Sequence, residues 1–283
     1  MREGESFFRR DEFMVGYEVQ TGWGFPIALD FFFSGTGAAL FLFSLIFHSP
    51  AGIILGLIFL VIGVLLLFFD LGAPWRVWKA FSKLKTSWIS RGTLFITITV
   101  LFGIFDALAG FPEVPWWVLI VFGAIAVMVV LYPGMVISYS PSMAAWNHPL
   151  TPILFGLHSL TSALSILFVI DAYSDGELGG MIWIQLILFV FLLVGMIIFV
   201  LVSKASTSGA RESVRLLSKG KERFFFLFMG IFVGIILPMA LLLAMPGAAS
   251  PLGWVVAACI LRLVGDLGFR HSILKVGLYE PVI

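Results

Sequence analysis

Five polar side chains interrupt otherwise apolar stretches of the sequence, and they are the residues best suited to chemistry. They are Asp30, Tyr132, His158, Arg262 and Asp266. An ionisable side chain inside a membrane-spanning helix disfavours insertion by roughly 2.5–3.5 kcal/mol, so it indicates a functional role by default. A phenol and an imidazole can donate hydrogen bonds, and a carboxylate can accept a proton from a bound molecule. The set predicts a polar pocket in which protons are exchanged.

The composition places these residues in a membrane protein. Hydrophobic residues make up 60% of the 283 residues and charged residues only 12%, whereas a soluble domain has about 25% charged residues. The single cysteine, Cys259, excludes a disulfide framework and any cluster ligated by cysteines of this chain alone. No phosphate-binding loop, nucleophile elbow or metal-ligand spacing stands out, and no nucleic acid partner is expected.

Eight stretches are long and apolar enough to cross a bilayer, which takes about 20 residues each. The predicted fold is an all-α integral membrane protein, a single membrane domain over residues 1–283 with eight transmembrane helices in a bundle. A polar lead-in, residues 1–24, precedes the first helix. The predicted helices cover approximately residues 25–47, 51–69, 92–109, 116–137, 152–170, 181–202, 224–245 and 252–267.

The basic residues predict the orientation of the chain. Apart from Arg262, every Lys and Arg lies before the first predicted helix, after the second, after the sixth or after the eighth. With eight spans, all of these segments fall on one side of the membrane. Because basic residues accumulate in cytoplasmic segments, both termini are predicted to be cytoplasmic.

The five polar residues lie at a similar predicted depth. Counting 1.5 Å of helical rise per residue places all of them within roughly 2–10 Å of the cytoplasmic boundary. Plainer interpretations stay open. Tyr132 suits an interfacial aromatic belt, His158 a hydrogen-bonded core position, and Arg262 with Asp266, four residues apart, a helical salt bridge. The sequence has no basic residue within one helical turn of Asp30, which makes Asp30 the hardest to explain structurally.

Four passages resemble the NrfD-type membrane subunits of polysulfide-reductase-like complexes. Together they run through nearly the whole chain in matching order, and the Asp-Leu-Gly…Pro and Thr-Ser-Trp combination is the most specific of them. Where that family usually has Arg directly before the proline, this chain has Ala73, with Arg76 nearby. The passages are residues 26–39, residues 70–76 followed by 86–92, residues 132–138 followed by 146–152, and residues 261–263.

The resemblance implies a quinone-binding anchor subunit of a multi-subunit oxidoreductase in the cytoplasmic (inner) membrane of a prokaryote. Electrons would pass between a quinone, menaquinone or ubiquinone, and an iron–sulfur (ferredoxin-like) partner, with a catalytic subunit of molybdopterin type beyond it. The chain is not expected to be catalytic alone. No metal and no haem are expected, since a di-haem site needs four buried histidines and only His158 lies within a predicted span. Proton translocation and the direction of electron flow stay open.

The resemblance also assigns expected roles to residues. By position, Asp30, Tyr132 and His158 are the expected catalytic residues, and Arg262 and Asp266 complete the expected quinone site. The iron–sulfur partner is expected on the cytoplasmic face, at residues 1–24 and the loop 70–91. Its expected docking residues are Asp70, Trp75, Arg76, Trp88 and Trp146. Asp70 can alternatively pair with Arg76 at a helix end, where a charge is tolerated.

Two other functions remain possible from the sequence. A secondary transporter would also have many spans and intramembrane charges, but transporters place broken helices at the midplane, whereas the polar groups here gather near one face. A passive anchor without a quinone site would tolerate Asp30→Asn and Tyr132→Phe. Copurification with an iron–sulfur protein, detected by EPR, would separate the oxidoreductase subunit from the transporter.

Overall fold

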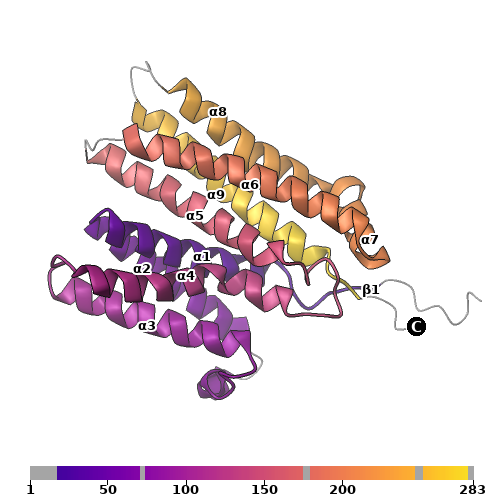
Figure 1. Cartoon of the computed structure of the whole chain (residues 1–283), viewed down its shortest axis with the longest axis horizontal. Coiled ribbons are helices and arrows are strands. Elements are labelled where there is room, and N and C mark those ends of the chain that lie inside the picture. Colours follow the sequence, from indigo (N-terminus) through magenta and orange to yellow (C-terminus); the bar gives the residue numbers. More distant parts are fainter. Residues whose placement is uncertain (1–17, 71–73, 175–178, 246–250, 280–283) are drawn as a thin grey trace, which may run out of the picture.

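The computed structural model describes residues 18–70, 74–174, 179–245 and 251–279, and these form a helical bundle (Figure 1). Eight segments of this part are long and apolar enough to cross a membrane, which confirms the predicted all-α membrane fold. They are α1 (Phe25–Ile46), α2 (Pro50–Asp70), α3 (Trp88–Leu108), α4 (Trp116–Ser138), α5 (Leu150–Tyr173), α6 (Gly179–Ala205), η3 (Phe224–Ile236) continued by α8 (Leu237–Ala244), and α9 (Pro251–Lys275).

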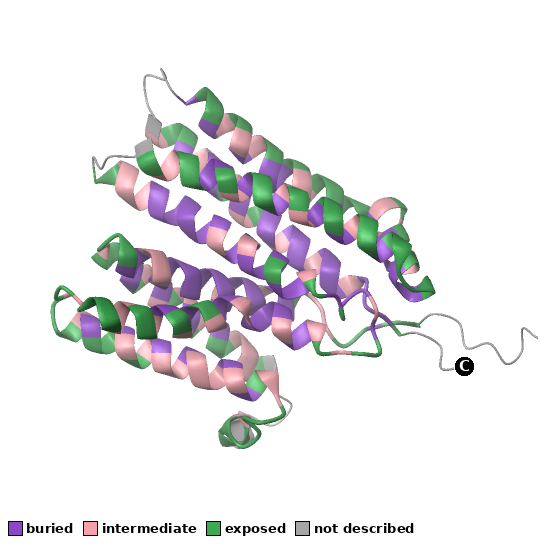
Figure 2. Cartoon of the chain, in the orientation of Figure 1, coloured by how far each residue is buried: buried purple, intermediate pink, exposed green. Residues whose placement is uncertain are grey.

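The helices form two groups that share a central seam. Helices α1 to α4 make one group, and α5, α6, the η3–α8 helix and α9 make the other (Figure 1). Contacts of α1 with α5 and α9 join the groups. Burial is highest on α1 and α5 (Figure 2). Apolar side chains of the outer helices, such as Ile58, Phe105 and Phe191, are exposed on the bundle surface, where lipid takes the place of a protein core.

Small residues allow the closest helix contacts, because lipid supplies no hydrophobic drive for helix association. A Cβ atom on Gly265 of α9 would lie 2.0 Å from the Cα atom of Gly234 in η3. A Cβ atom on Gly37 of α1 would lie 2.8 Å from the backbone nitrogen of Leu60 in α2. Any side chain at Gly265 or Gly37 would therefore push its two helices apart.

Helix α9 continues past its predicted end at Leu267 and stops at Lys275. The sequence prediction ended it too early because it took the charged residues as a sign that the chain was leaving the membrane. At 1.5 Å per residue, Asp266 lies about 14 Å and Arg262 about 20 Å from the end of α9. Both are therefore much deeper than the roughly 2–10 Å predicted from the sequence.

One end of the bundle is here called the basic end, after the Lys and Arg residues in its segments. The first and the last described residues both lie there. There β1 (Glu18–Val19) pairs antiparallel with β2 (Leu278–Tyr279). The side chain of Gln20 donates to the backbone oxygens of Trp23, at 2.7 Å, and Leu274, at 2.8 Å. The segment before α1 is thus bonded to the last turn of α9. The short helices η2 (Pro74–Phe81) and α7 (Ser208–Lys219) belong to the same end. The cytoplasmic location of this end stays a prediction.

Helix α7 lies within the segment 203–223, for which the sequence analysis predicted only a basic connection. Its buried residues Ala210, Val214 and Leu217 are spaced as on one face of a helix. The hydroxyl of Ser213 donates to the backbone oxygen of Val276 at 2.7 Å. This amphipathic helix therefore packs on the chain that follows α9 and closes the basic end.

Candidate functional site

A cavity of about 400 Å³ lies near the basic end, between α1, α2, η2, α3 and α4. Its wall is mainly apolar and aromatic. The hydroxyls of Thr93 and Thr97 in this wall donate to backbone oxygens of their own helix. The ionisable side chains in the lining are Asp30 and Tyr132. The lining residues are Trp23, Ile27, Asp30, Phe31, Val64, Leu67, Phe68, Ala80, Phe81, Ile89, Thr93, Ile96, Thr97, Tyr132 and Val136.

Asp30 and Tyr132 face this cavity from two different helices. Each is only 2% exposed to bulk solvent. The ring of Tyr132 lies against α3 at Gly92, where a Cβ atom would meet the ring at 2.1 Å. The same ring packs edge-on against Phe31, with the ring centres 6.4 Å apart. The absence of a side chain at Gly92 therefore lets the phenol reach the cavity.

The cavity extends to the outer surface of the bundle. Val64 of α2, Phe81 of η2 and Ile89 of α3 line it and are themselves exposed. Those side chains belong to the apolar surface that faces lipid. The opening of the cavity is therefore lined by apolar side chains.

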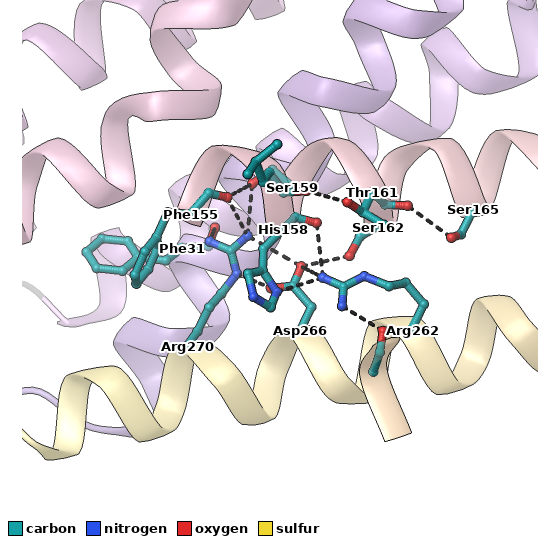
Figure 3. Close-up of polar contacts among 12 residues, drawn as sticks. Phe31, Phe155, His158, Ser159, Thr161, Ser162, Ser165, Arg262, Asp266 and Arg270 are labelled. Carbon is teal, nitrogen blue, oxygen red and sulfur yellow. Dashed lines mark hydrogen bonds and ion pairs between the residues drawn. The ribbon is translucent and has the colours of Figure 1, made fainter. Parts of the chain in front are cut away.

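A second polar group, here called the buried network, lies behind the cavity between α5 and α9 (Figure 3). It consists of His158, Arg262, Asp266 and Arg270, and all four side chains are fully buried. The Arg270 Nε donates to Asp266 Oδ1 at 2.7 Å, and the Ser162 hydroxyl donates to Asp266 Oδ2 at 2.8 Å. Arg262 approaches the same carboxylate at 3.9 Å. Asp266 is therefore the counter-ion of two guanidinium groups.

Arg262 connects α9 to both η3 and α5. Its Nη1 donates to the backbone oxygen of Gly234 at 2.8 Å. In an α-helical turn the donor for that oxygen would be residue 238, but Pro238 has no N–H. The Arg262 Nη2 lies 2.7 Å from His158 Nδ1. A guanidinium can only donate, so Nδ1 is the acceptor of this hydrogen bond. The same Nδ1 lies 3.4 Å from Asp266 Oδ1.

Arg270 connects the buried network to the cavity wall. Its Nη1 donates to the backbone oxygen of Phe31 at 2.9 Å, and its Nη2 donates to the Ser159 hydroxyl at 2.8 Å. Phe31 lines the cavity and directly follows Asp30. The sequence analysis missed Arg270, although its spacing of four residues from Asp266 is that of a helical ion pair. Arg270 is a buried contact between α9 and α1, not part of a cytoplasmic tail.

The structure separates the predicted quinone residues into two sets. Asp30 and Tyr132 line the cavity, whereas His158, Arg262 and Asp266 do not. These three are fully buried, and Arg262 contacts His158, Asp266 and the backbone oxygen of Gly234. They lie behind the cavity wall, and their expected part in quinone binding stays a prediction.

The family described as polysulphide reductase, NrfD, matches residues 16–281, nearly the whole chain. The chain belongs to the NrfD family. NrfD proteins are membrane subunits of quinone-linked oxidoreductases, in complexes with iron–sulfur and catalytic subunits. No curated protein matches the chain. Within the described residues, no group of three or more His, Cys, Asp or Glu side chains could hold a metal ion.

The predicted docking residues of this NrfD chain differ in whether their side chains are described and in how far they are buried. The side chains of Asp70, Trp75 and Arg76 lie outside the described residues. Trp88 is half-buried at the start of α3, with the Arg91 guanidinium 4.6 Å from its ring centre.

Trp146, the last of the predicted docking residues, is only 2% exposed. Its Nε1 donates to the backbone oxygen of Ile273 at 2.8 Å, and its ring lies 5.3 Å from that of Trp23. Trp146 therefore braces the basic end internally, and its expected role in docking stays a prediction.

His148 gives this NrfD chain a predictable response to pH. Its Nδ1 accepts from the backbone N–H of Leu150, the first residue of α5, at 3.1 Å, and burial lowers its pKa below the ordinary 6.5. The unfolded chain therefore binds a proton on His148 at a higher pH than the folded chain does. The contribution of His148 to stability is complete above about pH 6.5 and falls as the pH drops below that value.

We expect the thermal midpoint of the protein in detergent to fall between pH 7.5 and pH 5.5. The variant His148→Asn keeps an acceptor for Leu150 and cannot titrate, so its midpoint should fall less over this range. Differential scanning fluorimetry of both proteins measures the difference. Identical pH profiles would contradict this role of His148.

Proposed function

We propose that the chain binds a quinone in the cavity lined by Asp30 and Tyr132, and that electrons pass there to or from an iron–sulfur partner. The cavity is the observation that carries this proposal. Its volume of about 400 Å³ lies in the range of small-molecule sites, which combine apolar walls with a few polar groups. A bound quinone supplies the two-electron, two-proton redox chemistry, and the protein must bind it and manage the protons.

Asp30 and Tyr132 have complementary roles in this proposal. The Tyr132 hydroxyl donates a hydrogen bond to a carbonyl oxygen of the ring. The Asp30 carboxylate accepts a proton from a ring hydroxyl, or returns one to it, as a general base and acid. Both groups are shielded from bulk water, so each interaction is stronger than it would be at a surface. The exposed rim at Val64, Phe81 and Ile89 leaves room for an isoprenoid tail to extend into lipid.

The buried network supports this site without touching it. Arg270 fixes α1 at Phe31 and thereby sets the position of the neighbouring Asp30. With His158 neutral, two guanidinium groups face one carboxylate, and the excess positive charge stabilises negative charge on the cavity side. A guanidinium keeps its proton at physiological pH. We therefore propose proton exchange at Asp30 without a transmembrane relay through the network.

The proposed partner surface is the basic end next to the cavity, on the cytoplasmic face. Helix η2 carries the exposed Trp78 and Lys79, and its Ala80 and Phe81 line the cavity. An iron–sulfur subunit resting on η2 and on Trp88 would therefore lie against the cavity wall. Asp70, Trp75 and Arg76 belong to the same segment. A catalytic subunit would bind beyond the iron–sulfur subunit.

Filling the cavity tests this function. Thr93 lines the cavity from α3, and Thr93→Trp places an indole where the quinone ring is proposed to bind. In the purified complex, we expect added quinol to reduce the oxidised iron–sulfur clusters, or added quinone to oxidise the reduced ones. Thr93→Trp should slow this reaction at least tenfold and lower the quinone content of the complex.

The matched control is Ile104→Trp, an exposed position on α3 away from the cavity, which should behave as wild type. EPR of the clusters and chromatography of extracted quinone provide the two readouts. Wild-type quinone content and cluster kinetics in Thr93→Trp would contradict the proposal.

A further inference from the structure

A second cavity of about 470 Å³ lies on another face of α1, between α1, α2, η3 and α9. It is here called the aromatic groove. Phenylalanines, including Phe32, Phe59 and Phe225, form much of its wall, and α9 contributes Val264. The single ionisable side chain of the groove is His271, at its basic end. The proposed quinone site does not use any of these residues.

Basic groups stand over the basic end of the groove. The Lys275 Nζ lies 3.5 Å from the place that a Cβ atom would take on Gly24, just before α1. His271 Nε2 lies 4.0 Å from Glu222 Oε2. Burial raises the pKa of Glu222, and the nearby ammonium groups of Lys275 and Lys221 counteract that rise. Among the described residues, Lys275 therefore supplies a positive charge at this rim, beside His271 and Glu222.

The start of α1 adds to the positive potential there. No side chain caps the N-terminus of this 22-residue helix, and its first turn has no acidic residue. Pro26 has no N–H and the Ala28 N–H bonds to the Gly24 oxygen, so the attraction for an anion comes mainly from the helix dipole. The rim therefore combines the Lys275 side chain with a helix N-terminus, next to an apolar groove.

The length of the groove indicates what can fill it. Its lining runs from Phe25 to Phe33 on α1 and from Leu263 to His271 on α9, which is about 12 Å along each helix. This is close to one leaflet of a hydrocarbon core about 30 Å thick. A spanning helix of a partner would need a groove through both leaflets. A quinone ring would need hydrogen-bond partners inside the groove, and the lining provides them only at the rim.

We propose that the aromatic groove binds one anionic phospholipid of the leaflet at the basic end. Its acyl chains lie between α1 and α9 against the phenylalanines, and its phosphate and anionic headgroup lie between Lys275 and the start of α1. Since α1 also carries Asp30, the lipid supports the helix that forms the wall of the first cavity.

Native mass spectrometry of the detergent-purified, delipidated complex tests this proposal. The probes are phosphatidylglycerol and phosphatidylcholine with the same acyl chains. We expect one phosphatidylglycerol to bind at least fivefold more tightly than phosphatidylcholine. Lys275→Gln should remove about fivefold of that preference, the typical contribution of one basic residue to anionic-lipid affinity. Val264→Trp fills the groove and should weaken both lipids at least fivefold.

Two controls match these variants. Lys204→Gln removes an exposed charge at the end of α6, and Val194→Trp alters a lipid-facing position that is 45% exposed, against 42% for Val264. Both should bind lipid as wild type. If Val264→Trp does not assemble, Leu267→Phe tests the same groove. Equal affinity for the two lipids, or unchanged binding after both groove substitutions, would overturn the proposal. Displacement of phosphatidylglycerol by inorganic phosphate or by a short-chain quinone would also overturn it.

Discussion

Asp266→Asn is expected to lower the free energy of unfolding by roughly 3–5 kcal/mol, the usual effect of removing one partner of a buried ion pair. The substitution hardly changes the shape of the side chain. It removes the carboxylate charge that the fully buried Arg262 and Arg270 both contact. Unfolding by denaturing detergent, followed by the near-ultraviolet signal of the tryptophans, measures this loss.

Two further variants identify the cause. Asp106→Asn removes a buried acid of α3 that makes no ion pair with any described residue, and should change stability by less than about 1 kcal/mol. The triple variant Asp266→Leu, Arg262→Met, Arg270→Met removes all three charges together. It should recover most of the stability lost in Asp266→Asn, because apolar residues often replace buried ion pairs without loss. An Asp266→Asn protein as stable as wild type would refute this account of the network.

Asp30→Asn is expected to slow quinol-coupled turnover by about 10²–10⁴-fold, the typical contribution of a positioned general base. The amide has the size of the carboxylate but cannot accept the proton. Apparent affinity for the quinol should change little, because the cavity wall stays intact. Tyr132→Phe removes one hydrogen bond and should slow turnover only about tenfold. Steady-state assays of the intact complex with a soluble quinol analogue measure both effects.

Ser34→Ala is the matched control for Asp30→Asn. Ser34 is buried one turn further along α1, and its hydroxyl donates to the backbone oxygen of Asp30 at 2.8 Å. This variant should keep at least half of the wild-type turnover, since it leaves the carboxylate unchanged. If Asp30→Asn and Tyr132→Phe both turn over as wild type, the chain is a passive anchor and the cavity has another use.

The spanning helices could be predicted because lipid imposes a simple rule. A chain in hydrocarbon must satisfy its backbone hydrogen bonds within each helix, so long apolar stretches become helices. The rule fails where charges pair inside the bundle. Arg262, Asp266 and Arg270 made the end of α9 resemble a water-exposed segment. Each of them has a buried partner, so the helix continues.

The candidate site was predicted only in part. Hydropathy identified Asp30 and Tyr132 as costly residues in apolar segments, and depth placed them near the same boundary. Their meeting in one cavity depends on how α1 and α4 pack, which hydropathy does not determine. Trp146 shows the opposite failure. It was expected to be a docking residue, but Gly277 leaves room for its ring inside the protein, where a Cβ atom would meet the ring at 2.6 Å.

The bonds of Arg270 and Gln20 have a consequence for biogenesis. All residues that line the first cavity lie between Trp23 and Val136, so the ribosome has made them before the chain is half complete. The wall at Phe31 is nevertheless held by Arg270 of α9, and the segment before α1 is held by Leu274. Because synthesis proceeds from the N-terminus, the cavity stays unbraced until the final helix inserts. A chain that ends before α9 contains every lining residue of the cavity but lacks the helix that holds the proposed quinone site in shape.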